Sequence, residues 1–370
     1  MSLFLTTFPL PLIDFISTLN RALVLNDLNP TSSPALKMRI PYPDLLAALT
    51  RACRNLDIPK AELCAQLFAE TTLDGVYTHG LNRFPRFRQM IQTAAIDSHA
   101  FAHPLPPVYG HHTAVVNLER WDGHRGPGNI NAHLSMARAI ELARVSGIAC
   151  IALGNTSHWM RGGSYGWQAA NAGLIGICWT NTLPNMPAWG TAQPTAGNNP
   201  FVISVPRPNG HIVLDMAMSQ FSYGTLAAYA QQNKQLPVPG GYNAAGDLTQ
   251  NPGEIEESQR ALPIGFWKGS SFALVLDIIA STLAQSLSTH QLTPDPLQEI
   301  GLSQVFIAIN PATIGGSTAI ADAVINDLHS KSPLNPSNPI RYPGEETLRL
   351  RHENLKLGVP VDPEIWQSLQ

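Results

Sequence analysis

The sequence predicts an α/β protein in which a mixed sheet is combined with helical N- and C-terminal regions. Three observations support this fold class. Helix and strand patterns alternate between residues 129 and 180, as in layered α/β folds. Two β-rich stretches flank Asn209-Gly210, a strong hairpin signal that adds antiparallel strands. Apolar residues recur at helical spacing near both ends of the chain.

The N-terminal helical region begins at Pro43-Asp44, which suit the first turn of a helix. Apolar side chains then form one stripe at Leu46, Leu49, Cys53 and Leu56. Residues 61–68 continue the same period, so we expect a second helix there.

Residues 74–87 follow, and they contain a histidine, two arginines, two glycines and three aromatic residues. Gly75 and Gly80 free the backbone on either side of His79. Pro85 disfavours a regular helix through the two residues before it. The stretch is therefore predicted to be a shaped loop, and loops on a rigid scaffold often carry chemistry.

His79 and Arg83 together suit the reduction of a 2-oxo acid. The imidazole can protonate a carbonyl oxygen, and a guanidinium four positions later can hold the substrate carboxylate. The alternative is structural: the histidine bonds a turn, and the arginines cover aromatic surface. The spacing of these two residues leaves both interpretations open.

The middle of the chain alternates between helices and strands. Helices are expected at 129–145 and 165–172, and strands at 148–153 and 174–180. Further β-rich pieces lie at 201–206 and 211–215. Residues 235–254 are rich in proline and glycine and are predicted to form a long surface loop or flap.

The last third begins with the clearest helical pattern, at 268–288, with Phe272, Leu276, Ala280, Leu283 and Leu287 on one face. A strand is expected at 304–309, then helices at 319–328 and 345–357 with a proline-rich loop between them.

Composition excludes several classes of function. Charged residues are 13% of the chain, against roughly 25% in typical domains, and the formal charge is -3 without basic blocks. Nucleic acid is therefore an unsuitable partner, while a surface poor in charge favours an oligomer. The apolar run at 272–284 carries Asp277 and is too short to span a membrane.

The cysteines and histidines suggest neither disulfides nor a metal. Cys53, Cys64, Cys150 and Cys178 lie in apolar surroundings without C-x-x-C spacing, which indicates free thiols and a cytoplasmic protein. A metal-dependent hydrolase is disfavoured because H-E-x-x-H and H-x-H are absent and His111-His112 are adjacent.

The stretch Y-T-H-G-L-N-R-F-P-R-F at 77–87 resembles the signature of the type 2 malate/L-lactate dehydrogenase family. Residues 155–167, 176–181 and 266–270 support the resemblance, which runs from about Met38 to the C-terminus. It implies a dispensable extension at 1–37, a helical region with the catalytic loop at 38–122 and a mixed-sheet cofactor domain at 123–299. Residues 300–370 would then form a strand and helices that pack back on the N-terminal region.

A nicotinamide site would ordinarily be signalled by G-x-G-x-x-G, which this chain lacks. The resemblance implies instead a non-Rossmann mixed-sheet fold that binds NAD(P), as NADH or NADPH, at a homodimer interface. The implied cofactor contacts are His211, Ile212, Val213, Leu214, Asp215, Met216, Ala217, Trp267, Lys268, Gly344, Glu345 and Glu346.

Each of these contacts has an ordinary alternative. Asp215 can cap a turn, Lys268 can be a solvated helix start, and Glu345-Glu346 can complement a helix dipole. The residues alone do not decide between these roles and cofactor binding.

The resemblance also implies a reaction. His79 would be the proton donor in NAD(P)H-dependent reduction of a 2-oxo acid, with Arg83, Thr78 and His158 at the substrate. The expected conversion is 2,3-diketo-L-gulonate to 3-dehydro-L-gulonate, and malate, lactate or a cyclic imino acid (pyrroline- or piperideine-2-carboxylate) are alternatives. Thr78 and Asn198 replace the family's usual serine and threonine. A catalytically inactive binding protein on the same fold is the alternative outside this class.

Overall fold

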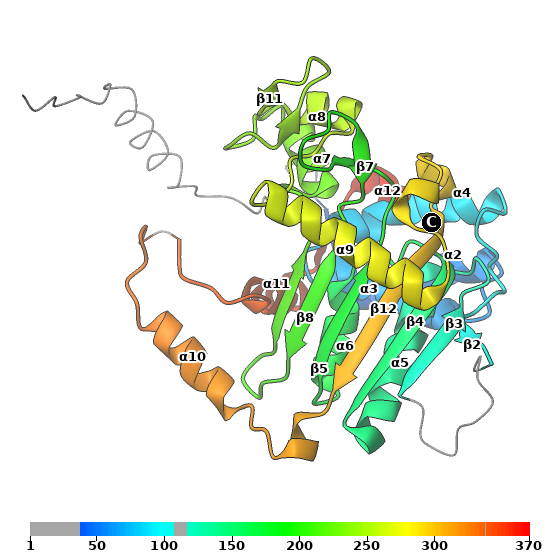
Figure 1. Ribbon diagram of the computed structural model, residues 1–370, viewed down its shortest axis with the longest axis vertical. Helices are drawn as coiled ribbons and strands as arrows, with labels where there is room; N and C mark the ends of the chain where they lie inside the picture. Colours follow the sequence, from blue (N-terminus) through cyan, green and yellow to red (C-terminus); the bar gives the residue numbers. More distant parts are fainter. Residues whose placement is uncertain (1–37, 107–116, 337) are drawn as a thin grey trace, which may run out of the picture.

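The computed structural model describes residues 38–106, 117–336 and 338–370. The expected extension at 1–37 and the pair His111-His112 lie outside the described residues. At the centre is a seven-stranded sheet with helices on both faces (Figure 1). In sheet order the strands are β2 (His103–Pro104), β3 (Leu118–Asp122), β4 (Ile148–Ser157), β12 (Ile300–Ile309), β5 (Ile175–Thr180), β8 (Phe201–Val205) and β9 (Ile212–Met216).

The sheet is mixed, which confirms the predicted fold class. β3 and β4 run parallel, whereas every other neighbouring pair is antiparallel. β8 and β9 form the hairpin expected around Asn209-Gly210, and Gly210 has the positive φ of 107° that its turn requires.

β12 lies in the middle of this sheet, between β4 and β5. The domain division expected from the sequence assigns its residues to the C-terminal segment 300–370 instead. Helices α5 (Gly128–Ser146) and α6 (Gly163–Asn171) cover one face of the sheet, and α9 (Trp267–Ala284) crosses the other (Figure 1). Central strands are therefore buried on both sides, which explains their continuous apolar runs. The boundary drawn at residue 300 remains a prediction.

The N-terminal helices form a second core beside the sheet. It contains α2 (Tyr42–Asn55), α3 (Ala61–Leu73) and α4 (Phe84–Gln92). The C-terminal part joins it: β13 (Val359–Val361) pairs with β1 (Met38–Ile40), and α11 (Glu345–Leu357) contacts α3. The final helix α12 (Pro363–Gln367) adds Ile365 and Trp366 to this core.

Residues 220–262 form a small lobe. The stretch 235–254, expected to be a long surface loop or flap, is mostly irregular but contains a short hairpin and the start of a helix. The lobe contains α7 (Tyr223–Gln231), the hairpin β10 (Gly241–Tyr242) and β11 (Leu248–Thr249), and α8 (Pro252–Ser258). Leu236 and Ile255 are buried in its own apolar core, which orders a stretch whose proline and glycine content suggested a flap.

The remaining elements connect these units: β6 (Met186–Pro187), β7 (Pro194–Ala196), η3 (Thr289–Gln291), η4 (Pro296–Gln298), η5 (Pro311–Ile314) and α10 (Ala319–His329). α10 stands on an arm away from the body of the molecule (Figure 1). α9 ends at Ala284 rather than at Ser288, because Gln285 adopts a left-handed conformation with φ 48°.

The four cysteines are free, as expected, and Cys53, Cys64 and Cys178 are buried. In the described part of the chain no helix has the length and apolar character needed to cross a bilayer.

Candidate active site

The predicted catalytic loop consists of two short 3-10 turns between α3 and α4. They are η1 (Tyr77–His79) and η2 (Leu81–Arg83), and α4 follows directly at Phe84. The expectation that Pro85 prevents a helix here is wrong. Pro85 lies in the first turn of α4, where a missing backbone N–H leaves no helical hydrogen bond unmade.

Thr72 of α3 anchors the loop from beneath. Its hydroxyl oxygen accepts a hydrogen bond from the Leu81 backbone N–H at 2.8 Å. A Cβ on Gly80 would overlap the Thr72 hydroxyl and lie 2.8 Å from the Thr72 backbone nitrogen. This close approach to Thr72 requires glycine at position 80.

His79 is half-buried at the end of η1. Its Nδ1 lies 3.1 Å from the Thr78 hydroxyl, and its ring faces the His158 ring at a centroid distance of 5.9 Å. Burial, with the nearby charges of Arg83 and Arg161, lowers the pKa of His79 from 6.5 to about 4. The imidazole of the free protein is therefore neutral at pH 7.

His158 is buried just beyond the C-terminal end of β4. Its Nδ1 accepts a hydrogen bond from the Met160 backbone N–H at 3.0 Å, so the neutral ring carries its proton on Nε2. Burial, followed by the charge of Arg83, holds the His158 pKa well below its usual range. The structure thus brings His158 to His79, while its bond to Met160 also gives it a structural role.

Arg83 is turned toward a buried carboxylate that sequence reasoning missed. Its Nη2 donates to Glu299 Oε2 at 2.8 Å, and Arg86 Nη2 donates to the same oxygen at 3.1 Å. Glu299 precedes β12 and is 216 positions from Arg83. Its acidic side chain directly before an apolar run was the one local signal.

The other predicted substrate residue, Thr78, touches the small lobe. A Cβ on Gly224, near the start of α7, would lie 2.5 Å from the Thr78 hydroxyl and 3.1 Å from its methyl carbon. The methyl group that distinguishes threonine from serine is thus accommodated because residue 224 is a glycine.

Asn198 belongs to a hydrogen-bond network and not to the His79 loop. Its Oδ1 accepts from Thr182 Oγ1 at 3.0 Å and from Asn185 Nδ2 at 3.1 Å. Tyr223 joins the same region by donating to the Asn185 carbonyl at 2.6 Å.

The predicted cofactor segments meet along β9. The Val213 N–H donates to the Pro343 carbonyl at 2.9 Å, and a Cβ on Gly344 would lie 3.1 Å from the Val213 nitrogen. At the other end, the Ile264 N–H donates to the Met218 carbonyl at 2.9 Å. Through this bond, the segment that leads to Trp267 and Lys268 lies beside Met218, just beyond the end of β9.

The side chains in these segments differ in whether they are free to contact a cofactor. Lys268 is exposed and makes no ion pair with any described residue. Asp215 is exposed and accepts from the Gly163 N–H at 2.8 Å. Glu345 instead accepts from the Tyr342 N–H at 3.0 Å and contacts His329, and Glu346 contacts Arg341 and Arg349. Their carboxylates are already engaged within the protein, which supports the structural alternative for both.

His211 also has partners within the chain. Its Nδ1 accepts from the Arg207 N–H, its Nε2 lies 3.0 Å from Asn171 Oδ1, and its ring contacts Trp167. Ile212, Leu214, Met216 and Ala217 are half-buried.

A buried ionic network, which the sequence did not indicate, joins the His79 loop to the sheet. Asp74 accepts from Arg161 and, at 2.6 and 2.7 Å, from Arg351. The Arg351 guanidinium also lies over the Trp167 ring at 4.9 Å. The network holds α11, the end of α3 and the segment after β4 together around the site.

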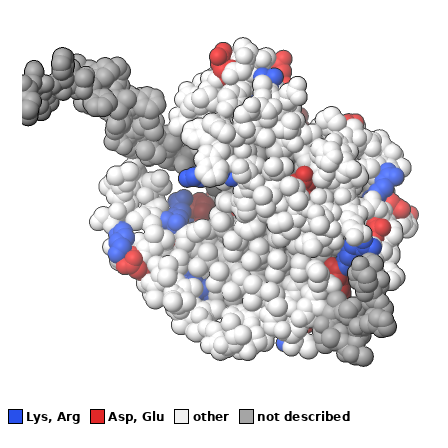
Figure 2. Space-filling view, viewed as in Figure 1, with Lys and Arg blue, Asp and Glu red and all other residues white. Residues whose placement is uncertain are grey.

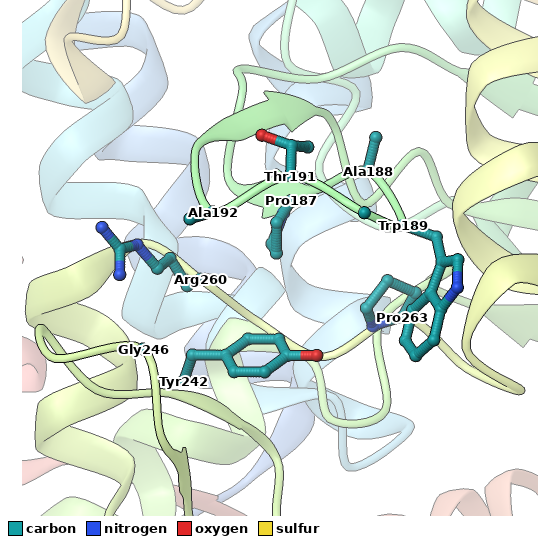
Figure 3. A pocket seen from close by; sticks show the side chains of 10 residues that line it. Pro187, Ala188, Trp189, Thr191, Ala192, Tyr242, Gly246, Arg260 and Pro263 are labelled. Carbon is teal, nitrogen blue, oxygen red and sulfur yellow. The ribbon is translucent and has the colours of Figure 1, made fainter.

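A cavity of about 440 Å³ lies between the β6–β7 connection and the small lobe (Figure 3). It is lined by Pro187, Trp189, Tyr242, Arg260 and Pro263 among others, and it contains none of the predicted site residues. Within the described residues no group of His, Cys, Asp or Glu side chains could hold a metal ion.

A non-Rossmann mixed sheet with a histidine and an arginine on one short loop suits the oxidoreductases that act on 2-oxo acids, and the comparisons with known proteins give this class. The malate/L-lactate dehydrogenase family model matches residues 40–370, and the chain belongs to this family. The predicted resemblance is thereby confirmed, and with it a nicotinamide cofactor.

The relatives carry more specific names. The chain is 43% identical over 338 residues to a 2,3-diketo-L-gulonate reductase of Escherichia coli O6:K15:H31, covering 90% of this chain and 99% of the relative. A protein of the same name from Shigella boydii serotype 4 is 42% identical with the same coverage.

Solved structures share the fold. A putative malate/lactate dehydrogenase from E. coli is 27% identical with a TM-score of 0.82, covering 90% of this chain and 93% of that one. The delta1-piperideine-2-carboxylate reductase from Pseudomonas syringae pvar. tomato has a TM-score of 0.80 at 22% identity, covering 90% and 99%.

Proposed function

We propose that this protein reduces 2,3-diketo-L-gulonate to 3-dehydro-L-gulonate with NADH. The observation that carries the proposed reaction is the placement of His79 and Arg83 on one short, half-buried loop, close enough for the arginine charge to lower the histidine pKa. The choice of substrate rests on the relatives that are 42–43% identical over nearly their whole length.

The residues of the loop would have different roles in the reaction. Arg83 binds the substrate carboxylate, and His79 donates a proton to the carbonyl oxygen as the carbon is reduced. The Thr78 hydroxyl, 3.1 Å from His79 Nδ1, orients the ring. In the protonated ring that acts as the acid, Nδ1–H donates to this hydroxyl, and Nε2–H is the proton free to face the substrate.

Substrate binding and protonation are coupled in this arrangement. Arg83 lowers the pKa of His79 through its positive charge. A carboxylate bound to Arg83 offsets that charge, so the His79 pKa rises when the substrate is present. His79 is therefore protonated to a greater extent when the substrate is bound than in the free protein.

The donor set along β9 suits a dinucleotide. The Lys268 ammonium, which pairs with no carboxylate of the described residues, lies in the first turn of α9 and would hold phosphate. Gly344, with its φ of 97°, packs closely against Val213 and so keeps its segment beside the other end of β9. When bound, reduced nicotinamide supplies the hydride.

A homodimer completes the proposal. Five large apolar side chains on α9 are between 38% and 53% exposed, namely Phe272, Leu274, Val275, Ile278 and Ile279. The molecular face that α9 crosses carries few charged side chains (Figure 2). A second copy of the chain would bury this patch. The cytoplasmic location inferred from the free thiols remains a prediction.

An absorbance assay tests the function. Purified protein is mixed with NADH or, separately, NADPH, and then with 2,3-diketo-L-gulonate, pyruvate, oxaloacetate or a cyclic imino acid. Oxidation of NADH that is fastest with diketogulonate is expected. Faster turnover of another acid would show that the substrate is that acid, with the same family chemistry. A folded protein that oxidises neither NADH nor NADPH with any of these acids would overturn the proposal.

A further inference from the structure

The geometry around Arg83 points to Glu299 as a positioning residue that fixes both the orientation and the net charge of the carboxylate-binding site. This inference rests on the proposed function, because it takes Arg83 as the group that binds the substrate. We propose that Glu299 makes the site selective for a 2-oxo acid with one carboxylate over one with two.

The contacts define the orientation. Glu299 is only 5% exposed, and its Oε2 accepts from Arg83 Nη2 at 2.8 Å and from Arg86 Nη2 at 3.1 Å. Both arginines come from the η2–α4 segment, whereas Glu299 lies between η4 and the central strand β12. The shared oxygen therefore holds the two guanidiniums side by side.

The two arginines are not equivalent. Arg86 also donates through Nε to the Pro296 carbonyl at 2.9 Å, so it is tied to η4 as well as to Glu299. For Arg83, Glu299 is the partner found among the described residues. Arg83 therefore keeps donors for a ligand, while the single bond to Glu299 sets the direction in which they point.

The charges set the selectivity. Two guanidiniums and one carboxylate leave one net positive charge, and the neighbouring His79 and His158 are neutral at pH 7 because their pKa values are lowered. Asp295, the next acidic group toward Arg86, is exposed and accepts from the Leu297 N–H at 2.8 Å. One substrate carboxylate balances this cluster of Arg83, Arg86 and Glu299. A further positive charge lies nearby, because Arg161 and Arg351 share the single carboxylate of Asp74. Glu299 therefore lowers, rather than abolishes, the attraction for a second substrate carboxylate.

Oxamate and oxalate test this charge balance without requiring turnover. Both are small two-carbon anions, but oxamate carries one negative charge and oxalate two. We would titrate each into the protein with reduced cofactor present, for wild type, Glu299→Gln, Glu299→Asp and the control Glu119→Gln. Glu119 also binds an arginine, Arg138, but at the β3 edge of the sheet.

In Glu299→Gln, which leaves both guanidiniums uncompensated, the ratio of oxamate affinity to oxalate affinity should fall by about tenfold. Glu299→Asp keeps the charge, so its ratio should match wild type while oxamate binds more weakly through the shorter side chain. Glu119→Gln should match wild type in both quantities. An unchanged ratio in Glu299→Gln overturns the inference.

A thermal unfolding scan shows which variants are folded. Where Glu299→Gln is not folded, Glu299→Asp decides: weaker oxamate binding at an unchanged ratio supports the inference, and wild-type binding overturns it. A ratio that depends on Glu299 in a protein without reductase activity would refute the proposed function alone. Reductase activity with a ratio independent of Glu299 would refute this inference alone, and wild-type protein that neither binds oxamate nor turns over refutes both.

Discussion

His79 releases its proton readily because burial and two guanidiniums disfavour the imidazolium. This electrostatic setting, and not the histidine alone, distinguishes the residue from a histidine that merely bonds a turn. The two arginines whose charges act on the ring come from different segments of the chain: Arg83 lies within the loop, and Arg161 follows β4. Under the proposed function, burial and the arginine that would bind the substrate together lower the pKa of the proton donor.

Replacing His79 by glutamine removes the proton donor and keeps a polar side chain of similar size. We expect turnover of the 2-oxo acid to fall by about 10²- to 10⁴-fold, while the dissociation constant of NADH, followed by fluorescence titration, stays nearly unchanged. His133→Gln, at a half-buried histidine of α5 away from the loop, is the control. Turnover close to wild type in His79→Gln would exclude the assigned role.

The pH dependence of reduction follows from the lowered His79 pKa. Reduction needs the protonated imidazole, and above its pKa of about 4 in the free protein the protonated fraction falls about tenfold per pH unit. Therefore kcat/KM for the 2-oxo acid should decrease as the pH rises from 4 to 8. A profile that stays flat up to pH 6.5 and falls only above it would contradict the depressed pKa.

The variant Arg83→Gln tests whether the charge of Arg83 lowers the His79 pKa. Removing its positive charge should raise the His79 pKa and move the falling limb of the kcat/KM profile to higher pH, in addition to raising KM. A falling limb at the wild-type pH would show that Arg83 does not act on His79.

At the scale of elements, the loop that carries His79 and Arg83 depends on a close contact with α3. Gly80→Ala would force a Cβ into the Thr72 hydroxyl and backbone. We expect a loss of about 2–4 kcal/mol in the free energy of unfolding, measured by urea denaturation, together with reduced turnover. Gly253→Ala, in the first turn of α8 and with no atom closer than 3.4 Å to its added Cβ, should be nearly neutral. Equal effects of the two substitutions would argue against a Thr72 anchor.

Elements with regular periods were predictable, and those set by tertiary contacts were not. The helices and strands between residues 129 and 180 follow from alternating local patterns, and Gly147 and Gly173, both with positive φ, end the helices where expected. Pro85 was misjudged because a proline that breaks a helix and one that begins it look alike in sequence. The small lobe was missed because its core joins Leu236, inside the glycine-rich stretch, to Leu226 and Ile255 outside it.

At the scale of the whole molecule, the exposed apolar side of α9 should control assembly. Ile278→Asp places a charge on the patch, at a side chain that is 53% exposed, and should convert the proposed dimer to monomer without loss of folding. Sedimentation velocity measures the mass of each variant. Val145→Asp changes an apolar residue that is 78% exposed on α5 and should leave the dimer intact. Monomeric wild-type protein would refute the dimer.

The sequence by itself determined the family and the mixed-sheet class, and it put forward His79 and Arg83 as candidates, because these depend on local order: motif spacing, helical and strand periods, and one stretch of fourteen residues. Only the tertiary structure decided that Glu299 holds Arg83, that Arg161 and Arg351 share Asp74, and that β12 is central to the sheet. These contacts join residues 87 to 277 positions apart, and no local pattern encodes which distant charges meet once the core has closed.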